Sequence, residues 1–135
     1  MQEQAPYDPI AEMRRQIDGI DQLIIGAVRR RTSLAVAIGQ EKLRRGLPTY
    51  VLGRHGEVLD NYRNAVPEDD PMTQQDAVEL SELIQRIARD AQNRDRAVTE
   101  QEAVAARASL ADLAGEAAAV LAVGDGGAVA PPTSL

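Results

Sequence analysis

The chain has 135 residues and a net charge of −6, and 44% of its residues are hydrophobic while only 2% are aromatic. It contains no cysteine and a single histidine, His55, which excludes a disulfide framework, a thiolate nucleophile and a histidine cluster for a catalytic metal. The first ten residues lack the pattern of a secretion signal and no run of about 18 apolar residues occurs, so we expect one cytoplasmic domain without a membrane segment.

A short N-terminal extension, residues 1–8, precedes a long predicted helix over residues 9–45. Asp8 is suited to cap this helix, Pro9 to occupy its first position and Gly46 to end it. The helix would be about 55 Å long, and a compact chain of this size cannot cover so long an apolar stripe. We therefore expect a homodimer. The stripe consists of Met13, Ile17, Ile20, Ile24, Ala27, Leu34 and Ile38.

Two shorter helices are predicted after the long one. The first covers about residues 53–65, and the second begins after Pro71, where Thr73 and Asp76 resemble a capping box. No strand pattern competes with these helices, so the sequence predicts an all-α fold of one long and two shorter helices. The apolar positions expected on the last helix are Leu80, Ile84, Ile87 and Ala91.

The helical domain is expected to cover residues 9–98 and to be followed by a tail. Residues 99–123 are rich in alanine and only weakly periodic, which indicates an extension that is helical or disordered. Glycine and proline in residues 124–135 favour disorder. The sequence leaves open whether this tail docks on a partner enzyme.

The positive charge of this acidic chain is concentrated in residues 14–45, which hold eight basic and three acidic side chains. Lys42 is the one lysine among the 15 basic residues. Because duplex binding relies on many phosphate contacts over a broad surface, so small a basic segment favours a compact anion over nucleic acid. The alternative to anion binding is that any one of these arginines simply lies on a solvent-exposed helix face.

Arg31 interrupts the apolar stripe, four residues after Ala27. An arginine at such a position extends to solvent, pairs with an internal carboxylate or faces a bound anion. Lys42, eleven residues later, shares its helix face at a distance of about 16 Å. Arg14 lies about 25 Å before Arg31 and about 100° around the helix, so it can serve the same site only from a partner chain.

The run MRRQIDGIDQLIIGAVRRRTSLAVAIGQEK, followed by GLPTYVLGR, resembles the all-helical chorismate mutase family. The resemblance covers residues 10–95 and implies an intertwined homodimer that binds a small dicarboxylate. It implies that Arg14 reaches into the partner's site, and that Arg31 and Arg54 hold the two substrate carboxylates.

The resemblance further implies that Lys42 and Gln92 contact the ether oxygen of the substrate. Gln92 lies one helical turn beyond Ala88, so both residues are expected at the substrate. Rearrangement of an enolpyruvyl ether is unimolecular and needs no metal, nucleophile or cofactor. Arginines suit this reaction because they bind carboxylates through paired hydrogen bonds. An ammonium suits it because negative charge develops on the ether oxygen as the carbon–oxygen bond breaks.

The resemblance implies that two positions lie near the ring hydroxyl of the substrate, and both depart from the family pattern. The family has aspartate where this chain has Val51, and glutamate where it has His55. These departures slightly favour 4-amino-4-deoxychorismate over chorismate as the substrate of the rearrangement. Isochorismate pyruvate lyase is an alternative on the same scaffold. A non-enzymatic helical dimerisation module, in which Arg31 only fixes the register of a coiled coil, is the alternative from another class.

Overall fold

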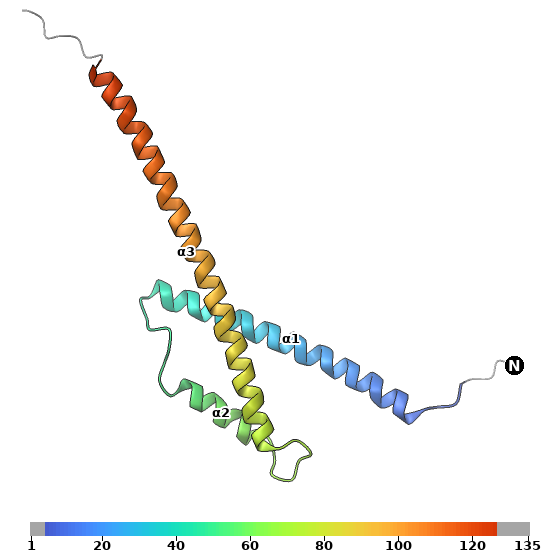
Figure 1. Ribbon diagram of the computed structural model, residues 1–135. Helices are drawn as coiled ribbons and strands as arrows, with labels where there is room; N and C mark the ends of the chain where they lie inside the picture. Colours follow the sequence, from blue (N-terminus) through green and yellow to red (C-terminus); the bar gives the residue numbers. More distant parts are fainter. Residues whose placement is uncertain (1–4, 127–135) are drawn as a thin grey trace, which may run out of the picture. The chain divides into compact units, whose positions relative to one another are not determined.

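The computed structural model describes residues 5–126, with side chains described for residues 5–121. It contains three helices in this range, α1 (Pro9–Arg44), α2 (Arg54–Asn64) and α3 (Gln74–Gly126), which confirms the predicted all-α class (Figure 1). The third helix is not short, however, because its 53 residues exceed the 36 of α1. It takes in the alanine-rich segment and residues 124–126. The rest of the tail predicted to be disordered lies outside the described residues.

The helix ends follow the local signals in the sequence. The Asp8 carboxylate accepts a hydrogen bond from the backbone N–H of Ile10 at 3.0 Å, with proline at the first helical position. At the start of α3, the Thr73 hydroxyl accepts from the Asp76 N–H at 3.0 Å, and the Asp76 carboxylate accepts from the Thr73 N–H at 3.3 Å. This reciprocal pair is the capping box expected from the sequence.

The chain divides into two units, Met1–Asp95 and Arg96–Leu135. In the first unit, the beginning of α3 lies beside α2 and crosses the C-terminal half of α1 (Figure 1). Val58 of α2 is buried here, together with α3 side chains at spacings of three and four, Ala77, Ser81, Ile84 and Ala88, and with Val78 beside Ala77. The predicted stripe on α3 is therefore wrong at Leu80, which is 41% exposed, because the small neighbour Ser81 faces the core.

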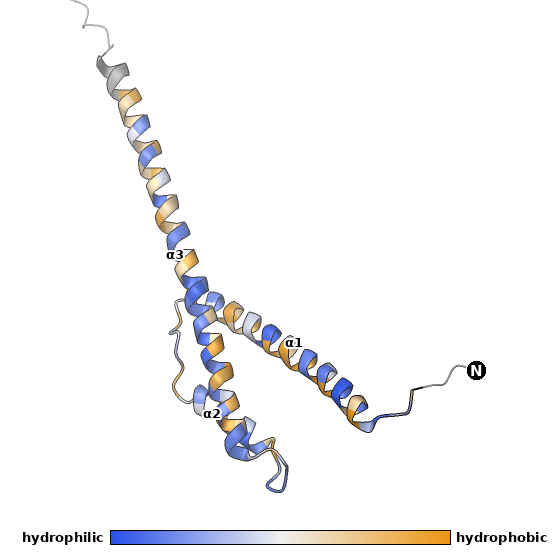
Figure 2. Ribbon diagram, turned by 45° about the vertical axis from the view of Figure 1, so that its right-hand side comes forward, coloured by the Kyte–Doolittle hydropathy of each residue, from blue (hydrophilic) through white to orange (hydrophobic). Residues whose placement is uncertain are grey.

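The apolar stripe on α1 is uncovered in the single chain. None of its residues is buried, and its large apolar side chains from Met13 to Ile38 are between 50% and 54% exposed along one face of the helix (Figure 2). Among the described residues, no helix is long and apolar enough to cross a membrane.

Candidate active site

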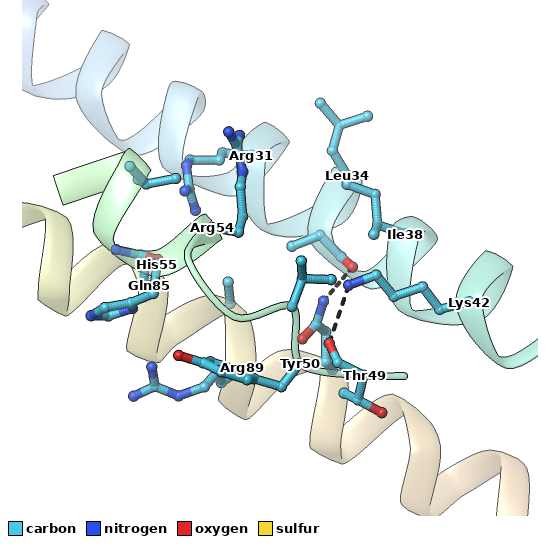
Figure 3. A pocket seen from close by; sticks show the side chains of 15 residues that line it. Arg31, Leu34, Ile38, Lys42, Thr49, Tyr50, Arg54, His55, Gln85 and Arg89 are labelled. Carbon is cyan, nitrogen blue, oxygen red and sulfur yellow. Dashed lines mark hydrogen bonds between the residues drawn. The ribbon is translucent and has the colours of Figure 1, made fainter. Parts of the chain in front are cut away.

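A cavity of about 300 Å³ lies in the first unit, between the C-terminal half of α1, the loop that follows it, α2 and α3 (Figure 3). Seven of the eight residues expected at the substrate line it, which are Arg31, Lys42, Val51, Arg54, His55, Ala88 and Gln92. The remaining wall is formed by Leu34, Ala35, Ile38, Thr49, Tyr50, Val58, Gln85 and Arg89. Residues from three helices and a loop thus meet around one space.

The charge of the cavity is opposite to that of the whole chain. Four cationic side chains line it, Arg31, Lys42, Arg54 and Arg89, and no carboxylate is among the fifteen lining residues. The chain as a whole carries a net charge of −6. Because cations gathered around a concave space concentrate anions there, the cavity suits a small, multiply charged anion.

Arg31 is half-buried and faces this cavity. Within the part of the chain whose side chains are described, it forms neither an ion pair nor a hydrogen bond, whereas five other arginines pair with an acid three or four residues away. Of the three interpretations of this break in the stripe, pairing with an internal carboxylate is therefore excluded for the described residues. A guanidinium in this position offers its donors to the cavity.

Lys42 reaches the cavity from the last turn of α1. Its Nζ donates a hydrogen bond to the Thr49 carbonyl oxygen at 3.1 Å, drawn as a dashed line in Figure 3. The chain turns back toward α1 after the helix because Gly46 adopts a positive φ of 65°. The Leu47 N–H then donates a hydrogen bond to the Lys42 carbonyl oxygen at 2.8 Å. An ammonium has three donors, so the bond to Thr49 orients the side chain and leaves others for a ligand.

Gln92 is held by the facing helix. Its Nε2 donates to the Ala35 carbonyl oxygen at 2.7 Å, and its side chain lies against Gly39, where an added Cβ would come within 3.4 Å of Gln92 Cγ. Because a carbonyl accepts only from the NH₂ group, this bond fixes which end of the amide faces α1. One amide N–H remains for a ligand.

Arg54 begins α2 after Gly53, whose φ of 91° is accessible chiefly to glycine. Its Nη1 bonds the Glu57 carboxylate at 2.6 Å, and both side chains are largely exposed, so this ion pair contributes little to stability. Glu57 is not part of the cavity lining. Arg54 therefore remains available to an anion in the cavity.

Sequence reasoning missed Gln85 and Arg89 of α3. Both line the cavity, and the Gln85 amide donates to the hydroxyl of the fully buried Ser81 at 3.2 Å. The signal for them was the spacing of α3, because steps of three and four back from Gln92 reach both residues. Arg14 lies on an exposed part of α1 and does not line the cavity.

Among the described residues, no group of three histidine or acidic side chains has the placement to hold a metal ion. The cations and amide donors of the cavity can bind an anion and stabilise negative charge, which are two means by which enzymes accelerate reactions.

The chain resembles known proteins. The family model described as chorismate mutase type II matches residues 13–93. The intracellular chorismate mutase of Mycolicibacterium smegmatis is 35% identical over 57 residues, which are 42% of this chain and 55% of that protein. The chain thus aligns with about half the length of this curated relative. No solved structure matched the chain.

Proposed function

The chain belongs to the chorismate mutase type II family, and on this premise we propose that it is an isomerase that rearranges chorismate to prephenate. The observation that carries the proposal is the cavity with four cations and no carboxylate. Chorismate is a compact dianion, and this lining offers it guanidinium and ammonium donors from three directions. The name of the Mycolicibacterium relative, intracellular chorismate mutase, agrees with the expected location in the cytoplasm.

Arg31 and Arg54 hold the two carboxylates in this proposal. A guanidinium binds a carboxylate through two parallel hydrogen bonds, which fixes orientation as well as position. Binding both ends of the flexible substrate holds it in the folded geometry in which the new carbon–carbon bond forms. Part of the entropic barrier is then overcome on binding.

Lys42 acts on the ether oxygen. As the carbon–oxygen bond breaks, negative charge grows on this atom, so an ammonium beside it stabilises the transition state more than the ground state. The hydrogen bond to the Thr49 carbonyl keeps the ammonium in place before the substrate arrives. Gln92, oriented by the Ala35 carbonyl, supplies the second donor to the same oxygen.

A homodimer completes the site in this proposal. The apolar face of α1 that is half-exposed in the single chain needs a cover, and a second copy covers it with its own α1. Arg14 lies on this helix too far from Arg31 to reach the cavity of its own chain. The partner's Arg14 then adds a further cation to the carboxylate-binding side.

4-Amino-4-deoxychorismate is a second candidate substrate, because Val51 and His55 both line the cavity where the family has acidic residues. Isochorismate, cleaved to release pyruvate, is the third. The reaction requires no cofactor in any of these cases.

Incubation of the purified chain with the three compounds in parallel, with products identified by mass spectrometry, tests the proposal. We expect prephenate from chorismate, at a rate proportional to protein concentration. Release of pyruvate from isochorismate with no prephenate from chorismate would overturn the proposal, and so would the absence of any product.

A further inference from the structure

Arg89 is a cation that the proposed mechanism does not use. The two carboxylates of chorismate are bound by Arg31 and Arg54 with the partner's Arg14, and the ether oxygen is bound by Lys42. Arg89 nevertheless lines the same cavity from α3. Its side chain is exposed, and within the described part of the chain the five ion pairs belong to other arginines.

The position of Arg89 relates it to one end of the substrate. A second, more open hollow adjoins the cavity, and only two residues, His55 and Arg89, line both. The two side chains therefore belong to the wall that both spaces share. The family resemblance places His55, with Val51, near the substituent at C4 of the substrate ring. Arg89 thus lies on the side of the cavity that faces this substituent.

The chemistry of a guanidinium distinguishes the two candidate substituents. A hydroxyl oxygen accepts a hydrogen bond from it, whereas a primary amine is protonated at neutral pH and has no acceptor to offer. The two cations would also repel each other, and like charges brought together disfavour the wrong partner. Two acids of the same helix, Glu79 and Glu82, line only the adjoining hollow, seven or more residues before Arg89. Asp90, the residue that follows Arg89, pairs with Arg86.

We infer that Arg89 is a specificity-determining residue that favours a hydroxyl over an amino group at C4, and thereby chorismate over 4-amino-4-deoxychorismate. The inference rests on the proposed function, because it assumes a chorismate-type ring bound in the cavity. It also reverses the slight preference that Val51 and His55 suggest from the sequence alone. Val51 and His55 stand where the family has acidic residues, so they only lower the negative charge near C4, whereas Arg89 brings a positive charge to the same side of the cavity.

The test compares kcat/KM for the two compounds in the wild-type chain, in Arg89→Gln and in Arg89→Glu. A compound that is not turned over is measured as a competitive inhibitor. We expect the wild type to prefer chorismate, the Gln variant to lose about tenfold of this preference and the Glu variant to lose more. Arg86→Gln is the matched control, because Arg86 lies on the same helix, lines only the adjoining hollow and pairs with Asp90.

A structural role for Arg89 would lower both rates together and leave their ratio unchanged, so an unchanged ratio overturns the inference. A wild type that prefers the amino compound also overturns it. In either case, turnover of chorismate by the wild type leaves the proposed function standing. A wild type that rearranges neither compound refutes the proposed function itself, and the inference with it.

Discussion

Replacement of Lys42 by alanine separates catalysis from folding. The side chain makes one described hydrogen bond, to the Thr49 carbonyl at 3.1 Å, and is half-buried. Loss of such a bond lowers the free energy of unfolding by about 1 kcal/mol, against about 5–15 kcal/mol for a folded domain. Loss of a preorganised donor to a developing negative charge lowers kcat on the order of a hundredfold to a thousandfold, or about 3–4 kcal/mol.

The assay measures initial rates of chorismate disappearance over a range of concentrations, together with thermal unfolding of the same samples. We expect a large fall in kcat with an unfolding temperature close to that of the wild type. Arg45→Ala is the control, because it removes a positive charge three residues further along the chain from an exposed position outside the cavity. A Lys42→Ala chain whose kcat lies within about threefold of the wild type would refute this reasoning.

Single substitutions at Arg31, Gln92 and Ile24 test the anion site, the second donor and the dimer. Arg31→Leu is expected to lose turnover while the unfolding temperature stays the same or rises, whereas full turnover in this variant would exclude Arg31 from substrate binding. Gln92→Leu removes the donor and the bond to the Ala35 carbonyl, so kcat should fall about tenfold or more, and an unchanged kcat would exclude Gln92 from the site. Ile24→Asp places a charge on the half-exposed face of α1 and is expected to shift the chain from dimer to monomer in analytical ultracentrifugation, whereas a monomeric wild type would contradict the proposed dimer.

Local signals predicted the helix ends well, because caps are made by neighbouring residues. Asp8 with Pro9 and Thr73 with Asp76 form the expected caps. The length of α3 was underestimated, since alanine-rich sequence with weak periodicity gives no signal of where a helix ends. Leu80 was misplaced because a periodic pattern favours large apolar residues, whereas the core of this unit admits the small Ser81 at the neighbouring position.

Seven of the eight residues expected at the substrate line one cavity, and most of them were expected from the family resemblance, which depends on several residue types at fixed spacings. Spacing on α1 placed Arg31 and Lys42 on one face, and both line the cavity. The position of Arg54 depends on a loop with two glycines of positive φ, which spacing cannot specify. Arg89 was missed because its spacing from Gln92 is the one signal for it, and that spacing does not distinguish a cavity wall from an exposed helix face.

In the proposed dimer, a cationic site completed by the partner's Arg14 rearranges chorismate, and a mixed dimer shows whether both chains contribute to one site. Arg14→Ala and Lys42→Ala chains carrying different tags are co-expressed, and the mixed dimer is purified through both tags. We predict that each variant alone is nearly inactive, while the mixed dimer has about half the wild-type rate, because one of its two sites combines an intact Lys42 with an intact Arg14 from the other chain. A mixed dimer as inactive as its parents, or an Arg14→Ala chain with the wild-type rate, would show that Arg14 does not complete the partner's site.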